Sequence, residues 1–597
     1  MFLRHACFVS TLFLNGFLFS LFLTSCGSAE NTELRSAEGE KYYGGFYKMN
    51  ETDGIKTLDP VLLSDAPSHH VVHQIADLLV DFDSSLRLQP ELAERWEISE
   101  DQTTYTYHLR KGVMFHDNPC FPDGKGREMM ASDVKYCFDR ILDARAASKG
   151  ADYFRDKVVG AQEYAKATAD NNGPIPEGGV AGFKVVGDYT FQIQLVKPFP
   201  GFKYYPALGF CYIYPKEAVE KYGKDFFRNL VATGPFVLKN WEADRELIVE
   251  RNPKYWRKDN NGNQLPFLDG IRFSFIKEQS TMLTEFKKGN LDENYRIPSE
   301  YIEAIFEKRE PGSNDPWKLK GEYTKFVLHL IPAIATQYYG MLTTDPVFSD
   351  RRVRQAFNYA IDRERVIAFV LKGQAIGPAN HGLVPPSMPN YPVDMVKGYT
   401  FDVGKAKALI AEAGYPNGEG FPAVKLQLNA GGGRNLEIAE AIEDQLKQNI
   451  GIDVEMQEVQ WAQHTERIDK GEAKFFRLGW IADYPEPENF LNLLWGKNAA
   501  LPGKLSPINS TRYSNPEFDV LFEQAMSTPD DTERYKLYAQ AEQIAVDDAP
   551  MLWIYHDLNF RLVQPWVKGY TSNSLDRRDL TGAWFDFTGT EKNTEAN

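Results

Sequence analysis

The stretch 477-RLGWIADYPEPENF-490 places a carboxylate, Asp483, between two aromatic residues, Trp480 and Tyr484, with Arg477 six residues before it. Burying a charge costs free energy unless an opposite charge meets it. The two charged groups therefore either satisfy each other or receive a charged ligand. If the chain stays extended here, Arg477 and Asp483 share parity and face the same side, a geometry compatible with both interpretations.

The composition is that of a globular protein with several domains. The 597 residues exceed the size of one hydrophobic core, and 43% hydrophobic with 25% charged residues is typical of folded proteins. The formal charge is −16 and becomes about −17 without the first 25 residues, which carry Arg4 and no acid. An acidic surface repels phosphate backbones, and no basic run with interleaved aromatics occurs, so we expect no nucleic-acid partner.

The first 25 residues predict an export signal. An apolar run from about Phe8 to Leu23 contains polar residues and is short for a membrane span. It leads into 23-LTSC-26, which resembles the bacterial lipoprotein signal, where cleavage precedes the cysteine and lipid is attached to its sulfur. An uncleaved anchor or an ordinary secretory signal is the alternative. Stable attachment needs more than one acyl chain, which the lipoprotein pattern supplies, so we expect an exported protein held to a bacterial membrane through Cys26.

Residues 26–41 are polar and lack an apolar period, so they predict a flexible tether before a globular part that begins near Tyr42. That globular part contains three cysteines, Cys120, Cys137 and Cys211. An odd count leaves at least one thiol free even if two of them pair. Disulfides are therefore not expected to be the framework of the fold.

Short strands alternate with helices along the globular part. Strand candidates are rich in β-branched or aromatic residues and include 104–110, 189–196, 246–252, 271–276, 424–430 and 452–459. Helix candidates include 132–144, 350–371, 402–414, 435–449 and 530–548. The segment 430-AGGGRN-435 lacks the lysine of a P-loop and the GxGxxG spacing, so we interpret it as a turn that leads into a helix. This mixture predicts an α/β architecture of several domains.

Seven blocks follow one another along nearly the whole chain: 58-LDP-60, 90-PELAERWEISEDQTTYTYHLRKGVMFHD-117, 131-ASDVKYCFDRIL-142, 233-TGPFVLKNWEADRELIVERNPKYW-256, 350-DRRVRQAFNYAIDRERVI-367, 479-GWIADYPEP-487 and 561-RLVQPWVKGY-570. In this order they resemble the solute-binding components of peptide ABC transporters, the oligopeptide- and dipeptide-binding proteins. The last blocks look most like the oligopeptide-binding branch.

The resemblance implies an α/β fold of the type II periplasmic-binding-protein class. In such a two-lobed clamp the lobes close about a hinge of crossover strands and engulf the ligand. One lobe would comprise residues 42–76, 195–326 and 556–597, with an inserted domain at 77–194, and the other lobe would comprise 327–555. The resemblance also implies a monomer that delivers peptides to a permease in the membrane and performs no catalysis. We expect no cofactor and no metal.

By resemblance, Asp483 receives the α-ammonium of a peptide. A free peptide is a zwitterion, so its site must supply an anion, a cation and strand-like backbone partners. Arg477 matches an arginine that reaches the ligand's carboxylate for some peptide lengths; alternatively it only pairs with Asp483, or Asp483 caps the turn before Pro485. The oligopeptide-binding pattern has a histidine where this chain has Asn435, with Arg434 beside it, so Arg434 is a second candidate for the carboxylate.

Aromatic side chains complete the expected site. Trp480 and Trp461 match positions that line side-chain pockets in the family, and we expect Tyr484 and Asn435 to line the same pockets. The alternative for an isolated tryptophan is a place in the core.

The segment 64-SDA-66 matches a strand that pairs with the peptide backbone through its N–H and C=O groups, which would involve Ser64, Asp65 and Ala66. Three histidines follow shortly afterwards, at positions 69, 70 and 73. Two of them would be neighbours on a helix, but no nearby cysteine or paired carboxylate completes a metal-ligand set. Solvated histidines at the start of a helix are therefore the preferred interpretation.

Two other functions compete with peptide transport. The same scaffold can serve a nickel chelate, haem, a modified peptide or a sugar oligomer, although an acid at position 483 favours an amine-bearing ligand over a neutral sugar. A secreted hydrolase is the other alternative. Neither HExxH nor GxSxG occurs, and a catalytic pair among the 83 acidic residues stays open on sequence alone.

Overall fold

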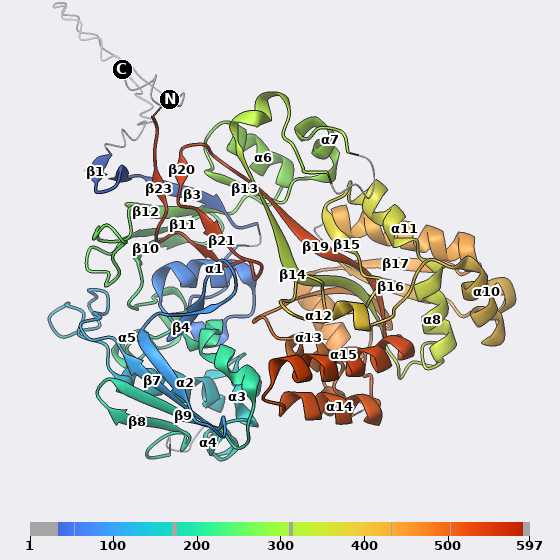
Figure 1. Cartoon of the computed structure of the whole chain (residues 1–597), viewed down its shortest axis with the longest axis horizontal. Coiled ribbons are helices and arrows are strands. Elements are labelled where there is room, and N and C mark those ends of the chain that lie inside the picture. Colours follow the sequence, from blue (N-terminus) through green and yellow to red (C-terminus); the bar gives the residue numbers. More distant parts are fainter. Residues whose placement is uncertain are drawn as a thin grey trace, which may run out of the picture.

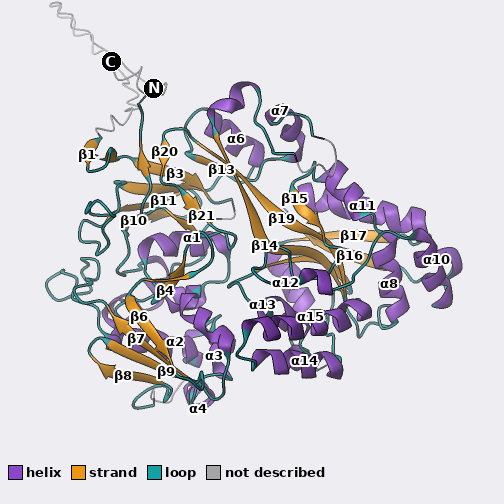
Figure 2. Cartoon of the chain, in the orientation of Figure 1, coloured by secondary structure: helices purple, strands orange, loops and turns teal. Residues whose placement is uncertain are grey.

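The structure is a computed structural model that describes residues 34–52, 54–169, 176–309, 315–430, 433–501 and 503–588. Figure 1 shows two halves joined by long strands, and Figure 2 shows that each half contains both helices and strands. The signal predicted for residues 1–25 and the predicted lipidation site Cys26 lie outside the described residues.

The half on the left of Figure 1, which we call the first lobe, is built on a four-stranded sheet. Its strand order is β10 (Phe236–Glu242), β11 (Glu246–Arg251), β12 (Gly270–Ser274) and β3 (Phe46–Asn50). β12 and β3 are parallel, so segments more than 200 residues apart share this sheet. Alternation along β11 turns Leu247 and Val249 into the core.

A second, antiparallel sheet lies within the first lobe, in the region that we call the inserted domain. Its strand order is β6 (Ala93–Ile98), β7 (Thr104–Leu109), β9 (Thr190–Gln194) and β8 (Phe183–Gly187). Helix α2 (Ala131–Leu142) packs against β8 and β9. Its buried residues Val134, Phe138 and Ile141 recur at helical spacing, so one apolar stripe faces the sheet.

The other half, which we call the second lobe, is built on a seven-stranded sheet. Its members are β13 (Glu293–Tyr295), β19 (Met551–Val563), β14 (Val327–Met341), β18 (Phe475–Ile481), β16 (Val424–Asn429), β17 (Val454–Val459) and, beside β19, β15 (Ala375–Pro378). The antiparallel strands β14, with 15 residues, and β19, with 13, run between the halves in Figure 1. These two strands form the connection about which the lobes can hinge.

Helices α8 (Arg351–Ala360), α10 (Val403–Glu412) and α11 (Gly433–Ile450) lie together at one end of the second lobe (Figure 1). α11 links the parallel strands β16 and β17, so the Gly-rich turn leads into a helix as predicted. The remaining helices are α1 (Ala66–Ile75), α3 (Ala151–Arg155), α4 (Ala161–Thr168), α5 (Lys216–Tyr222), α6 (Gln279–Lys287), α7 (Ile302–Ile305), α9 (Arg363–Arg365), α12 (Trp461–Asp469), α13 (Glu488–Leu491), α14 (Pro516–Met526) and α15 (Asp531–Asp548).

Short strands complete the fold: β1 (Arg35–Ala37), β2 (Lys41–Tyr43), β4 (Val80–Phe82), β5 (Leu88–Pro90), β20 (Val567–Lys568), β21 (Thr571–Ser572), β22 (Arg578–Asp579) and β23 (Trp584–Phe585). β1 and β2 pair as a hairpin in the segment where residues 26–41 predicted a flexible tether. Ion pairs of Arg35 with Asp269 (2.9 Å) and Lys41 with Asp259 (2.7 Å) fasten this hairpin to the first lobe. The described end of that segment is therefore folded.

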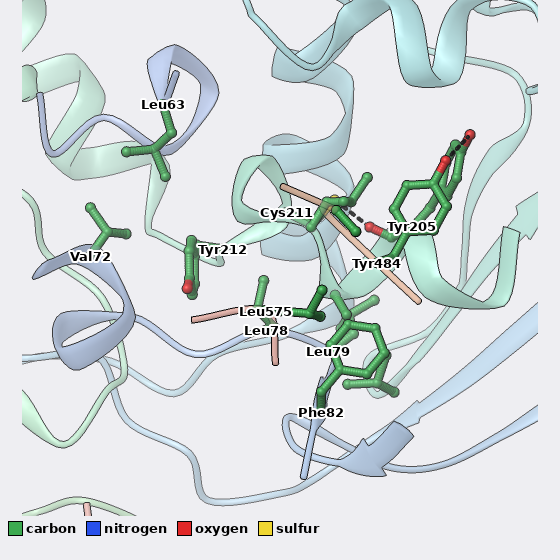
Figure 3. Packing of buried hydrophobic residues seen from close by; sticks show 14 of the residues in the cluster. Leu63, Val72, Leu78, Leu79, Phe82, Tyr205, Cys211, Tyr212, Tyr484 and Leu575 are labelled. Carbon is green, nitrogen blue, oxygen red and sulfur yellow. Dashed lines mark hydrogen bonds between the residues drawn. The ribbon is translucent and has the colours of Figure 1, made fainter. Parts of the chain in front are cut away.

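The hydrophobic core continues from the first lobe into the second. Figure 3 shows Tyr205, from the 3₁₀ helix Pro200–Ala207, beside Tyr484 of the second lobe. Their ring centroids are 5.4 Å apart, and both residues are 1% exposed. Aromatic packing thus joins the lobes directly.

The three cysteines of the globular part are free thiols; Cys137 and Cys211 are buried and Cys120 is half-buried. Within the described ranges, no helix has the length and apolar character that crossing a membrane requires. The domain boundaries given above stay a prediction.

Candidate functional site

Asp483, two residues after β18, is held from both lobes. Its Oδ2 accepts a hydrogen bond from the Tyr153 hydroxyl of the inserted domain at 2.7 Å and another from Asn489 Nδ2 at 3.3 Å. The Oδ1 atom of Asn489 in turn accepts from the Asp483 N–H (3.2 Å) and from Trp480 Nε1 (2.8 Å). No described residue donates a hydrogen bond to Oδ1 of Asp483. This oxygen is therefore oriented and still able to accept a donor.

The arginine that acts on the charge of Asp483 is Arg577, whereas the sequence suggested Arg477. Burial raises the pKa of Asp483, whereas the hydrogen bonds from Tyr153 and Asn489 and the charge of Arg577 lower it. Arg577 is itself engaged, because it donates to the carbonyl of Ala207 at 2.6 Å and forms an ion pair with an aspartate of the first lobe. The cation that acts on Asp483 thus comes from the C-terminal segment.

Arg477, on β18, is bound by amide side chains. Its guanidinium donates to Gln337 Oε1 and, at 3.3 Å, to Asn429 Oδ1. Gln337 then donates through Nε2 to Asp557 at 2.6 Å. No ion pair joins Arg477 to Asp483 in the part of the chain that the structure describes. The two charged groups of the opening stretch do not satisfy each other.

The second arginine candidate lies near the first. A small pocket is lined by Gln337, Asn435, Arg477 and Tyr555, together with apolar residues of α11 and the sheet. The guanidinium of Arg434 lies 5.7 Å from the centre of the Tyr555 ring and donates to a backbone carbonyl at 2.9 Å. The charges of Arg434 and Arg477 both lower the pKa of Tyr555, while burial raises it. The structure therefore brings Arg434, Asn435 and Arg477 to one tyrosine.

The predicted aromatic residues have different surroundings. Trp480 is half-buried and bonded to Asn489, whereas Trp461, the first residue of α12, is 46% exposed. Tyr484 is 1% exposed, packs on Tyr204 and Tyr205, and donates through its hydroxyl to a glutamate of α13. The structure places Tyr484 in the core, where the sequence predicted the lining of a pocket, because its ring fills the contact between the lobes.

The segment from Ser64 to Ala66 begins a helix. Asp65 caps α1 by accepting a hydrogen bond from the Ser68 N–H at 3.0 Å, and Ala66 is the first helical residue. The backbone of Asp65 is extended, but none of the strands among the described residues includes this segment. The sequence predicted a strand here, and the structure differs because the side chain of Asp65 satisfies the start of the helix.

The histidines of α1 are not solvated, which corrects the preferred interpretation of the sequence. His70 is 6% exposed, with Nδ1 2.8 Å from Glu51 Oε1, and Nδ1 of His73 lies 2.9 Å from the hydroxyl of Tyr212. Among the described residues, no three His, Cys, Asp or Glu side chains are grouped as metal ligands.

Sequence reasoning missed the groups that position Asp483. Asn489 lies within the opening stretch, six residues after the acid, and an amide near a buried carboxylate was a usable signal. Tyr153 and Arg577 are far away in the sequence, so no local pattern connects them to Asp483.

Comparisons with known proteins identify the family of this chain. The family model described as "Bacterial extracellular solute-binding proteins, family 5 Middle" matches residues 87–501. The chain is 28% identical over 530 residues to the periplasmic oligopeptide-binding protein OppA of Escherichia coli, covering 87% of this chain and 89% of that protein. It is 31% identical over 523 residues to heme-binding protein A of Haemophilus influenzae, covering 86% and 87%.

Solved structures show the same fold. The ABC transporter-associated periplasmic binding protein DppA from Helicobacter pylori, in complex with the peptide STSA, aligns with a TM-score of 0.74 at 25% identity, covering 91% of this chain and 98% of that one. The murein tripeptide binding protein MppA of Escherichia coli also aligns with a TM-score of 0.74. The predicted α/β fold of the type II periplasmic-binding-protein class is confirmed. The chain belongs to the bacterial extracellular solute-binding proteins of family 5.

Proposed function

We propose that this protein binds peptides between its two lobes and delivers them to the permease of an ABC transporter, without changing the ligand chemically. The observation that carries the proposal is the carboxylate of Asp483, which Tyr153 and Asn489 orient from both lobes through Oδ2 alone. Two similar proteins support it: one is named an oligopeptide-binding protein, and the other was solved with the peptide STSA.

The ammonium of a peptide would donate to Oδ1 of Asp483. A charge-assisted hydrogen bond of this kind contributes roughly 1.5 to 3 kcal/mol. Because Tyr153 and Asn489 hold the other oxygen, the carboxylate does not have to reorient when the ligand arrives. An ammonium would also stabilise the ionised form of Asp483, whose pKa burial raises.

The carboxylate end of the peptide is assigned to Arg477 and Arg434. Their common neighbour Tyr555 and the pocket lined by Asn435 support this assignment. Both guanidiniums are held by neutral oxygens of amide or carbonyl groups, so the described residues do not neutralise them. Between the two ends, side chains of the ligand would contact Trp480 and Trp461.

The cellular setting is proposed from the N-terminal sequence. The protein is exported, lipidated at Cys26 and held by this lipid on the periplasmic or cell-surface side of a bacterial membrane. By resemblance to the family, it works there as a monomer. The permease partner is the membrane component of the transporter.

Calorimetric titration with alanine peptides of two to six residues, each free and N-acetylated, tests the peptide function. Acetylation removes the ammonium, so we expect binding of the free peptides only. The same titration of Asp483→Asn tests the residue itself. Its matched control is Asp152→Asn, which removes an exposed acid one residue from Tyr153. If acetylated and free peptides bind equally, the role of Asp483 is wrong.

Haem is the second candidate, because the chain is 31% identical to heme-binding protein A and 28% identical to OppA. Titration with haem, followed by its visible absorption, separates the two candidates. Saturable haem binding together with no heat from any peptide would replace the peptide proposal.

A further inference from the structure

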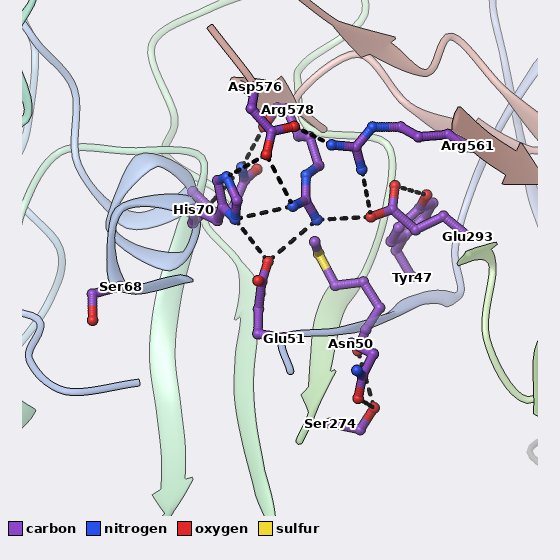
Figure 4. A network of polar contacts seen from close by, with 12 residues as sticks. Tyr47, Asn50, Glu51, Ser68, His70, Ser274, Glu293, Arg561, Asp576 and Arg578 are labelled. Atoms are coloured by element: carbon purple, nitrogen blue, oxygen red, sulfur yellow. Dashed lines mark hydrogen bonds and ion pairs between the residues drawn. The ribbon is translucent and has the colours of Figure 1, made fainter. Parts of the chain in front are cut away.

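A cluster of six buried ionisable side chains lies beside α1, at the ends of β13 and β19; Figure 4 shows these side chains from close by. Its members, which we call the hinge cluster, come from the loop after β3, from α1, β13 and β19, and from the C-terminal segment: Glu51, His70, Glu293, Arg561, Asp576 and Arg578. Each of the six is at most 9% exposed. The cluster therefore joins the first lobe to one end of the connecting strand β19 and to its neighbour β13.

Two arginines connect the carboxylates. Arg578 Nη1 lies 2.8 Å from Glu293 Oε1 and 3.2 Å from Glu51 Oε1. Arg561 Nη1 lies 3.4 Å from Glu293 Oε1, and its Nη2 forms an ion pair with Asp576. Glu293 and Arg561 belong to the neighbouring strands β13 and β19, so the ion pairs fix the position of these strand ends.

His70 closes the cluster on the side of α1. Its Nδ1 is 2.8 Å from Glu51 Oε1, and its Nε2 is 3.5 Å from Asp576 Oδ2. Nη1 of Arg578 also approaches Glu51 Oε1, at 3.2 Å, while Nη2 of Arg578 lies 3.0 Å from Nδ1 of His70. A guanidinium can only donate, so this last contact by itself favours an unprotonated Nδ1. A neutral imidazole has one N–H, whereas the imidazolium has two and can donate to both carboxylates. The contacts of both ring nitrogens with carboxylates, at 2.8 Å and 3.5 Å, therefore favour a protonated His70.

Other charged or titratable groups near His70 lie on α1, on β4, after β13 and in the C-terminal segment, and among them the charge of Arg296 acts on Asp576 of the cluster. His69 and His73 flank it, with ring centroids 6.2 Å apart, and burial lowers the pKa of both. His73 Nε2 is 3.7 Å from Asp81 Oδ2, and Arg577 forms an ion pair with the same aspartate. The pair of Arg577 and Asp81 is balanced, so it adds no net charge beside the hinge cluster.

The charge balance of the hinge cluster depends on one proton. Its three carboxylates and two guanidiniums leave one negative charge, which the imidazolium of His70 cancels. We propose that the hinge cluster is a proton-dependent lock on the hinge: protonated His70 holds the ends of β13 and β19 against α1, and loss of the proton releases them. An uncompensated buried charge is costly, so the deprotonated cluster favours arrangements that admit water. This inference does not depend on which solute the protein binds.

The direction of the pH effect follows from the surroundings of His70. Burial and Arg578 lower its pKa, but Glu51 and Asp576 raise it by more, so the net shift is upward. A raised pKa in the folded state means that His70 stabilises the closed packing fully below about pH 6.5, its value when unfolded. This stabilisation is lost as the pH rises through the folded value.

Two measurements on the purified protein test the lock. The first is an NMR titration of isotope-labelled histidine, in which we expect the His70 signal to titrate above its ordinary value of 6.5. The second is small-angle X-ray scattering, in which the radius of gyration should increase from pH 5.5 to 8.5 as the lobes separate. A His70 signal that titrates below pH 6.5, or a radius of gyration that does not change, would overturn the proposal.

The variant His70→Gln removes the titration while keeping an N–H donor, so its radius of gyration should be independent of pH. The matched control is His108→Gln, a partly exposed histidine 3.2 Å from Glu97, which should follow the wild-type protein. Glu51→Gln provides a second variant if His70→Gln does not fold. It removes one carboxylate and balances the charge of the cluster with neutral His70, so the protein should stay compact at pH 8.5. A His70→Gln or Glu51→Gln protein that expands with pH as the wild type does would contradict the lock.

Discussion

At the scale of single residues, the direction in which Asp483 faces is set by its neighbours. Replacing the charge by Asp483→Asn should weaken binding of tri-alanine by roughly 10- to 150-fold, the loss of one charge-assisted hydrogen bond. Tyr153→Phe removes only the positioning bond and should cost about fivefold. Calorimetry gives both values. Unchanged affinity in Asp483→Asn would contradict the ammonium site.

Glu542 predicts a separate dependence of stability on pH. It is 1% exposed, accepts hydrogen bonds from the N–H groups of Leu383 (2.7 Å) and Val384 (2.9 Å) and from the Tyr391 hydroxyl, and burial raises its pKa to about 7. Between its ordinary value of 4.5 and about 7, the unfolded chain releases this proton while the folded protein keeps it. The contribution of Glu542 to stability is therefore present at low pH and lost as the pH rises to 7.

The variant Glu542→Gln is neutral at every pH and should be more stable than the wild type at pH 8, by up to roughly 3 kcal/mol, but not at pH 4. Denaturant unfolding at several pH values measures the difference. Glu440→Gln, at an exposed position of α11, is the control and should change stability little. A difference that does not depend on pH would show that Glu542 is ionised in the folded protein.

At the scale of elements, α1 depends on its cap. Asp65→Ala leaves the Ser68 N–H without its partner and should lower the free energy of unfolding by about 1 kcal/mol. Asp65→Asn keeps the cap and removes only the charge beside Lys56, which lies 3.6 Å away. Chemical denaturation should find the asparagine variant close to the wild type. Equal losses in both variants would assign the effect to the ion pair.

Elements with a strong hydrophobic period could be predicted from the sequence, while elements decided by distant contacts could not. The buried stripe of α2 and the alternation along β7 predict a helix and a strand, and the structure has both. The segment beginning at Ser64 has no such period, and a cap at Asp65 decided its structure. His70 and His73 of α1 can be buried because they form hydrogen bonds with Glu51 and Tyr212, residues that lie outside the helix in the sequence.

At the scale of the whole molecule, aromatic contact between the lobes contributes to closure. The rings of Tyr204 and Tyr484 stack with centroids 6.2 Å apart, and such a pair contributes about 0.5 to 1.5 kcal/mol. Tyr204→Ala should therefore reduce the closed population and weaken tri-alanine binding by about 2- to 10-fold. Tyr42→Ala removes a comparable contact with Trp584 inside the first lobe and should leave the affinity unchanged. Equal losses would indicate a general effect on folding.

In the site, too, the residues within short sequence motifs could be predicted, whereas those brought together by distant contacts could not. The family resemblance drew attention to Asp483, Arg477 and Arg434 because short motifs surround them in the sequence. Tyr153 and Arg577 reach Asp483 only after the inserted domain and the C-terminal segment have folded around it. The periodicity of a single sequence cannot predict these contacts, because they depend on how the lobes are connected.

The three free thiols of the globular part also have a consequence for the whole molecule. No sulfur–sulfur bond joins Cys120, Cys137 and Cys211, and burial raises the pKa of each thiol, which keeps it in its unreactive form. The globular part therefore contains no disulfide among its described cysteines, and its folding does not require an oxidising compartment.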